Sequence, residues 1–155
     1  MKKQTSGRLL NVLIQMGEAL QNSGAEIYRV EDTLNRIGYA CGAEEMNVFV
    51  ITSSIVITLK MSGEESLTQT RRLRNSGNND FVKLEELNEL SRQICKSKIS
   101  LEEFEAELQK IVSQKANEKM LLLGNILAAA SFCIFYGGNL WDCLIAGIVG
   151  AGIWL

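Results

Sequence analysis

Apolar residues recur every three or four positions through the first quarter of the chain, which is the spacing of one helix face. The pattern predicts a helix over Arg8–Asn22 and a second helix that runs from Ser23 to a stop at Gly42. Ser23 and Glu26 have the spacing of a capping box, so we expect Ser23 to be the N-cap of the second helix. The first prediction is therefore a helical hairpin.

The period then changes from that of a helix to that of strands. Residues 47–52 and 55–59 are rich in β-branched side chains and predict two strands joined by a tight turn, and residues 66–73 add a third strand. Helical spacing returns over residues 81–95 and in a last helix, which opens with a second capping box at Ser100 and is expected to run on into the apolar end of the chain. This order predicts an α+β domain with a helix pair, a β-hairpin or small sheet, and two further helices.

Residues 120–155 are almost entirely apolar, and Asp142 is their only formal charge. A membrane-spanning helix needs about 20 apolar residues, which residues 120–136 approach before a Gly-Gly-Asn turn interrupts the run. We therefore expect residues 1–119 to form the α+β domain and residues 120–155 to begin a multi-span membrane domain. This part would be a transmembrane helical hairpin with a truncated second span, so that the chain is an integral membrane protein fragment. The alternative is a hairpin of two buried core helices.

Basic residues lie on one side of the first predicted span. Lys110, Lys115 and Lys119 precede it, and the turn that follows it carries no lysine or arginine. The positive-inside rule therefore predicts that the N-terminal domain lies in the cytoplasm.

Composition excludes several kinds of chemistry. The chain has no histidine and four cysteines without a CxxC pair, so neither a Cys/His zinc site nor a histidine-based triad can form, and we expect no metal and no cofactor. Scattered thiols fit a reducing compartment. The net charge of −2 gives no reason to expect a nucleic acid partner.

Two polar residues in the apolar region are candidates for a transport pathway. Asp142 is costly in a membrane unless it is paired or faces a wet cavity, so we predict a role in proton coupling or in the substrate path. The alternative is a helix N-terminal residue stabilised by the helix dipole. Asn125 is a second candidate, and its alternative role is a hydrogen bond to a neighbouring helix.

Three stretches resemble the threonine/serine exporter family of bacterial membrane proteins. Residues 23–34 read SGAEIYRVEDTL and match the family's SGAE-x-x-x-VE-x-x-L pattern on an early helix pair. Residues 51–55 (ITSSI) and 68–72 (TQTRR) match its hairpin and its Thr/Arg strand. Residues 137–142 (GGNLWD) are similar to its turn between the first two spans, although two extra residues separate the glycine pair from Trp141.

The resemblance implies a multi-pass inner-membrane exporter, a transporter rather than an enzyme. Its substrates would be small polar metabolites, namely threonine, serine or a dicarboxylate such as succinate, and we expect proton-driven export. The implied partners are the lipid bilayer, the small-molecule substrate, and a second small membrane subunit or further copies of this chain.

The resemblance also supports a polar cluster for substrate between the second helix and the sheet. Glu31 with Arg71 or Arg72 forms its centre, because an arginine there could bind a carboxylate through two hydrogen bonds. Glu26 and Arg29 lie on the same helical stretch and belong to the cluster. The alternative is a solvated helix surface on which Glu26 serves only as a cap.

Two other functions stay open at this point. The first is a membrane-anchored hydrolase, which without histidine would need a Ser/Lys pair or paired carboxylates, and no GxSxG motif is present. The second is a cytoplasmic regulatory or assembly module of a partner pore.

Overall fold

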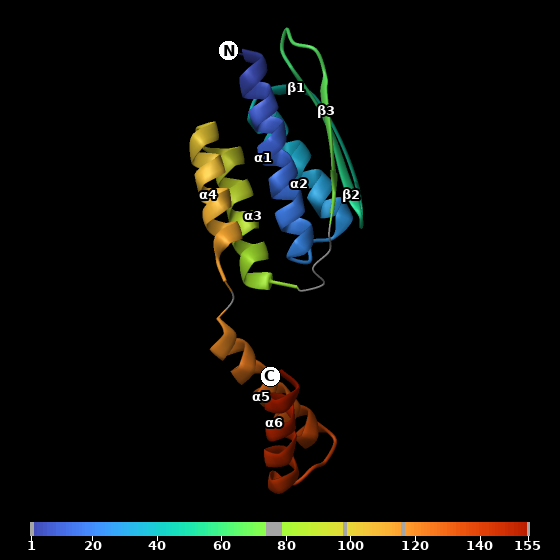
Figure 1. Cartoon of the computed structure of the whole chain (residues 1–155), viewed down its shortest axis with the longest axis vertical. Coiled ribbons are helices and arrows are strands. Elements are labelled where there is room, and N and C mark those ends of the chain that lie inside the picture. Colours follow the sequence, from blue (N-terminus) through green and yellow to red (C-terminus); the bar gives the residue numbers. More distant parts are fainter. Residues whose placement is uncertain (1, 74–78, 98, 116, 155) are drawn as a thin grey trace. The chain divides into compact units, whose positions relative to one another are not determined.

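The computed structural model describes residues 2–73, 79–97, 99–115 and 117–154, and it divides into two compact units (Figure 1). We call Met1–Gln114 the N-terminal unit and Lys115–Leu155 the C-terminal unit. The elements in chain order are α1 (Lys2–Asn22), α2 (Ile27–Ala40), β1 (Ala43–Ile51), β2 (Ser54–Met61), β3 (Leu67–Arg72), α3 (Phe81–Lys96), α4 (Leu101–Ser113), α5 (Glu118–Phe135) and α6 (Leu140–Trp154). The fold class is α+β, with two helices, a three-stranded antiparallel sheet and then four helices.

The sheet has the order β1-β2-β3, and side chains alternate between its two faces. Ile55, Ile57 and Leu59 of β2 point to the buried face and are fully buried. Phe49 and Ile51 of β1 lie on the opposite face and are exposed. One face of the sheet therefore closes the core of the N-terminal unit.

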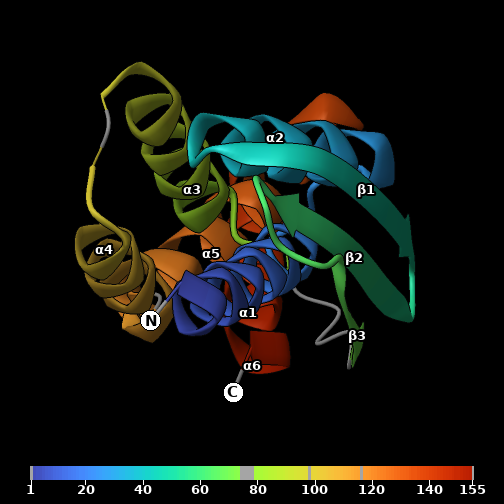
Figure 2. The ribbon, with the colours of Figure 1, turned by 90° about the horizontal axis from the view of Figure 1, so that it is seen from above.

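Helix α1 lies at the centre of the N-terminal unit. It contacts α2, β2, β3, α3 and α4, and Figure 2 shows it between the sheet and the pair α3 and α4. Its side chains are buried on more than one face, which is why its apolar residues do not form a single stripe; they include Leu9, Leu13, Ile14, Met16 and Leu20. Each such side chain contributes about 1.5–3 kcal/mol when it is fully buried.

The predicted ends of two elements are confirmed. Gly42 follows α2 with a φ of 95°, and its N–H donates to the carbonyl of Tyr39. Ser100 caps α4, since its hydroxyl accepts the Glu103 N–H while the Glu103 carboxylate accepts the Ser100 N–H. The expectation that this helix continues into the apolar region is wrong, because α4 ends at Ser113 and α5 begins separately at Glu118.

The C-terminal unit is a hairpin of α5 and α6. Gly137 ends α5 with a φ of 84°, and Gly138 N–H donates to the carbonyl of Cys133, which is a Schellman motif. Gly147 and Gly150 let the two helices approach closely, because a Cβ at Gly150 would lie 3.2 Å from the backbone oxygen of Asn125.

Helix α5 is the one helix among the described residues that is long and apolar enough to cross a membrane. It has 18 residues, and none of them is buried inside the structure. Helix α6 is also apolar but shorter.

Candidate functional site

The turn between α1 and α2 does not form as the capping box predicts. The N–H of Ala25 donates to the carbonyl of Leu20, and that of Gly24 donates to Gln21, so Ser23 and Gly24 complete α1 instead of starting α2. Gly24 has a φ of 94°, which only glycine adopts without strain. Helix α2 then starts at Ile27, with Glu26 as an N-cap whose side chain makes no capping bond.

This turn and α3 enclose a pocket of about 190 Å³. Its polar members are one carboxylate, one guanidinium, one hydroxyl and one amide, from Glu26, Arg29, Thr33 and Asn88. Its apolar members include Leu20 and Leu84, and Gly24 and Ala25 of the turn complete the lining. The predicted residues Glu26 and Arg29 are thus brought together, and Asn88 is a member that the sequence did not single out.

Glu26 and Arg29 form an exposed ion pair at 3.7 Å, with 68% and 69% of their side chains accessible. The guanidinium also donates to the Tyr28 hydroxyl at 3.1 Å. Tyr28, followed by Glu26, raises the pKa of Arg29 above its ordinary value, so the group stays cationic. A carboxylate and a guanidinium at the mouth of a small pocket can bind the ammonium and the carboxylate of an amino acid.

Glu31 and the two strand arginines have separate partners. The Glu31 carboxylate accepts the backbone N–H of Val50 on β1 at 2.8 Å. Arg71 lies 3.4 Å from Glu18 of α1. Arg72, the next residue on β3, points to the opposite face and is exposed. No ion pair joins Glu31 to either arginine in the described part of the chain, and the role of these residues in substrate binding stays a prediction.

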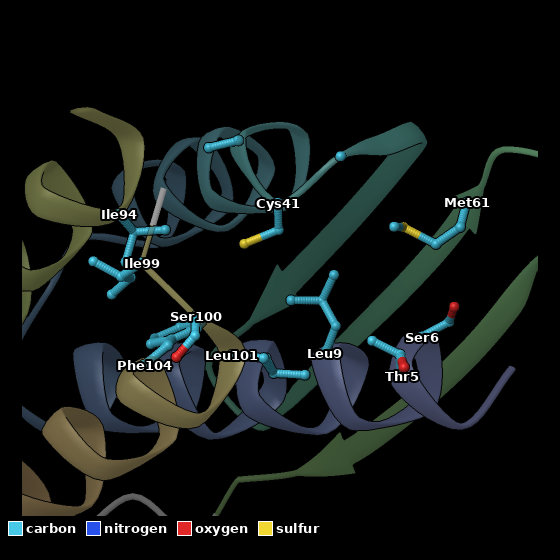
Figure 3. Close-up of a pocket in the computed structure, with 12 residues that line it drawn as sticks. Thr5, Ser6, Leu9, Cys41, Met61, Ile94, Ile99, Ser100, Leu101 and Phe104 are labelled. Carbon is cyan, nitrogen blue, oxygen red and sulfur yellow. The ribbon is translucent and has the colours of Figure 1, made fainter. Parts of the chain in front are cut away.

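A second pocket of the N-terminal unit, of about 260 Å³, was not expected from the sequence. Its lining comes from the N-terminal half of α1, the end of α2, β2, and the connection from α3 to α4 (Figure 3). Because these segments are far apart in the chain, no local pattern could have indicated it.

Asp142 lies at the start of α6 and is part of a reciprocal cap. Its carboxylate accepts the N–H of Asn139 at 2.9 Å, while the Asn139 side chain accepts the N–H groups of Trp141 and Asp142. This geometry is a capping box with asparagine and aspartate in the two roles. Asp142 therefore has a structural function at the helix start, whatever else it does. Asn125 is exposed on α5, near the crossing with Gly150.

The described residues contain no group of three histidine, cysteine, aspartate or glutamate side chains that could hold a metal ion. The polar pocket at the α1–α2 turn is the site whose chemistry fits a small charged solute.

A family model agrees with these observations. The model described as putative threonine/serine exporter matches residues 11–155, which covers most of both units. No curated protein and no solved structure matches the chain.

Proposed function

Because the chain belongs to the threonine/serine exporter family, we propose that it is a subunit of an inner-membrane secondary exporter of threonine or serine. The observation that carries the proposal is the match over residues 11–155, which includes the α+β unit as well as the helical hairpin. Family membership implies a transporter rather than an enzyme. The family description names threonine and serine, and for this reason a dicarboxylate is not part of the proposal.

An exporter family implies a membrane location, and the exposed surface of α5 and α6 supports it. Large apolar side chains on both helices are mostly accessible, among them Leu127, Phe132, Ile134, Ile148 and Ile153. A contiguous apolar surface of this kind needs lipid or other helices around it. The lysines that precede α5 favour a cytoplasmic N-terminal unit, as the positive-inside rule predicts.

The pocket at the α1–α2 turn is our proposed cytoplasmic substrate site. Arg29 would bind the carboxylate of the amino acid and Glu26 its ammonium group, so that the present ion pair opens to admit the zwitterion. Thr33 and Asn88 would serve the hydroxyl group that threonine and serine share. The volume of 190 Å³ exceeds the roughly 150 Å³ of an engineered cavity that holds benzene, so a small amino acid fits.

The other residues predicted from the sequence have proposed roles of a different kind. Glu31 and Arg71 hold α2 and α1 against the sheet, through Val50 and Glu18 respectively. Arg72 offers a cation on the outer face of the sheet. In the hairpin, Asp142 is the proposed proton-coupling group and Asn125 a polar position of the pathway.

We propose that the hairpin assembles with a second small membrane subunit, with further copies of this chain, or with both. The apolar outer faces of α5 and α6 are the surfaces that would make those contacts.

The proposal is tested by threonine efflux from cells. Cells that express the chain with its small membrane subunit are preloaded with labelled threonine, and efflux is followed with and without a protonophore. We expect faster efflux of threonine than of alanine, and loss of the difference when the proton gradient collapses. Efflux equal to that of cells carrying an empty vector would refute the proposal.

A further inference from the structure

The pocket in Figure 3 is partly open and is lined by five elements of the N-terminal unit and its α3–α4 connection. Leu9 of α1 and Phe104 of α4 form buried walls, with 4% and 1% of their surface accessible. The Cys41 thiol and the Met61 side chain lie on the side of α2 and β2 (Figure 3). The described residues that line it are Thr5, Ser6, Leu9, Ala40, Cys41, Gly42, Met61, Ile94, Ile99, Ser100, Leu101 and Phe104.

The size of this partly open pocket is sufficient for a small molecule. The volume is about 260 Å³, while an engineered apolar cavity of about 150 Å³ already binds benzene. The pocket is therefore large enough for a ligand.

The described lining residues favour an uncharged ligand. None of these residues carries a charge, and Thr5, Ser6 and Ser100 supply the side-chain hydroxyl groups. The Ser6 hydroxyl also donates to the Glu64 carboxylate, and the Ser100 oxygen accepts the Glu103 N–H. A zwitterionic amino acid would lose the hydration of both charges without gaining an ionic partner. The proposed substrate of the exporter therefore does not fit here.

We propose that this pocket binds an uncharged, mainly apolar small molecule with one polar group, which is distinct from the exported amino acid. The apolar walls match the body of such a ligand, and the hydroxyl groups match its polar group. Because the walls belong to α1, α2, β2, α3 and α4, the ligand stabilises their packing together, which gives it the position of an effector of the N-terminal unit. This inference goes beyond the export function and does not depend on it.

Two cysteines provide a direct readout of occupancy. Cys41 is part of the lining and half-buried, whereas Cys95 on α3 is exposed and is not among the lining residues. Burial, and to a smaller extent Cys95, raises the pKa of the Cys41 thiol, so a smaller fraction of this thiol is the reactive thiolate near neutral pH. A ligand in the pocket covers Cys41 and leaves Cys95 as an internal control.

The test uses the full chain in lipid nanodiscs, with indole as the neutral probe and indole-3-acetate as its charged counterpart. Alkylation by N-ethylmaleimide is measured separately at Cys41 and Cys95 by peptide mass spectrometry. With indole at ten times its dissociation constant, the Cys41 rate is expected to fall about tenfold, while the Cys95 rate is unchanged. Indole-3-acetate should not protect Cys41.

Two variants test the location. Ile99→Phe puts a larger side chain into the lining and should abolish protection by indole, while Ile51→Phe makes the same change on the exposed face of the sheet and should retain it. Equal Cys41 rates with and without indole in the unaltered chain would overturn the proposal, and this measurement does not depend on the folding of any variant. Protection that persists in Ile99→Phe would overturn it as well.

A lipid acyl chain has similar apolar chemistry, so a second arm of the test excludes it. The Cys41 rate in nanodiscs is compared with the rate in lipid-free amphipol, before any indole is added. We expect the two rates to agree. A slower rate in nanodiscs would mean that lipid occupies the pocket, and it would overturn the assignment to a soluble small molecule.

Discussion

The Glu31 carboxylate on α2 accepts the backbone N–H of Val50 on β1 at 2.8 Å. Strand β1 is an edge of the sheet, so alternate N–H groups along it have no strand partner. Val50 is 3% exposed, and its N–H group would otherwise be buried without an acceptor. A helix side chain thus completes the hydrogen bonding of the sheet edge at this point.

Removal of this acceptor should destabilise the N-terminal unit. Glu31→Ala leaves a buried N–H unpaired and is expected to cost about 1–3 kcal/mol, seen as a lower Tm of the full chain in nanodiscs. Glu31→Gln keeps an oxygen that can accept this hydrogen bond, so its Tm should fall by less than that of Glu31→Ala. Asp32→Ala is the matched control, because Asp32 makes only an exposed ion pair with Arg36 at 3.7 Å. Equal effects at Glu31 and Asp32 would contradict this interpretation.

Gly24 is predicted to be required by the backbone at the α1–α2 turn. Gly24→Ala forces a side chain into a left-handed conformation and places a Cβ 2.7 Å from the Asn79 side-chain oxygen, so the stability should fall by about 1–2 kcal/mol. In Gly7→Ala of α1, the added Cβ meets no described atom within 4 Å, and the substitution should instead stabilise the helix by about 1 kcal/mol. Thermal unfolding of both variants measures the difference, and changes of the same sign would argue against the geometry described for Gly24.

The proposed substrate pocket predicts that two exposed arginines of one helix behave differently. Arg29→Gln should raise the KM for threonine efflux several-fold, because the substrate carboxylate loses its cationic partner. Arg36→Gln removes an equally exposed arginine of α2, outside the pocket, and should leave KM unchanged. If both variants export as the unaltered chain does, the substrate lies elsewhere.

Two substitutions at Asp142 distinguish its role as a helix cap from the role of its negative charge in proton coupling. Asp142→Asn keeps an oxygen that can accept the Asn139 N–H, so the start of α6 should persist while proton-driven efflux is lost. Asp142→Ala removes the cap too, at a cost of about 1 kcal/mol. The readouts are Tm and the pH dependence of efflux. Unchanged efflux and unchanged pH dependence in Asp142→Asn would leave the residue with a structural role alone.

The contact between α1 and α4 should weaken in acid. Arg8 bonds Glu102 at 3.0 Å and Glu105 at 2.6 Å. The backbone N–H of Glu102 and then Arg8 lower the pKa of the Glu102 carboxyl from its ordinary 4.5. A lowered pKa contributes stability that is present above the ordinary value and is lost as the pH falls through the folded value.

The corresponding measurement is the Tm difference between the unaltered chain and Glu102→Gln. Both side chains are exposed, so the difference should be small near neutral pH, and it should vanish once the carboxyl is protonated. A Tm difference that grows as the pH falls below the ordinary pKa would contradict the assignment.

Periodicity was sufficient to predict the order of helices and strands, because each depends on residues close in sequence, but it did not show the break between α4 and α5. The start of α2 was not predictable in the same way. Ser23 with Glu26 satisfies the pattern of a helix start, while Ser23 with Gly24 satisfies that of a helix end, and only the conformation at Gly24 distinguishes them. The sequence around Ser23 is therefore compatible with both a helix start and a helix end, and it cannot distinguish them.

Contacts between distant elements were beyond the reach of the sequence. To predict whether Glu31 pairs with a strand arginine, one must know on which face of the sheet each arginine lies and which strand is nearest to α2. Alternation along β3 turns Arg71 toward Glu18, while α2 lies beside β1. Glu26 and Arg29 were found together because they lie one turn apart on the same segment.

The central position of α1 has a consequence for the order of events during synthesis. This helix is synthesised before α4, so Arg8 meets its partners only when Glu102 and Glu105 have left the ribosome. The apolar helix α5 follows α4 after a short connection. Completion of the N-terminal core and emergence of the apolar helix α5 therefore fall within the same interval of translation, and a delay in core completion leaves two apolar surfaces exposed to aggregation at the same time.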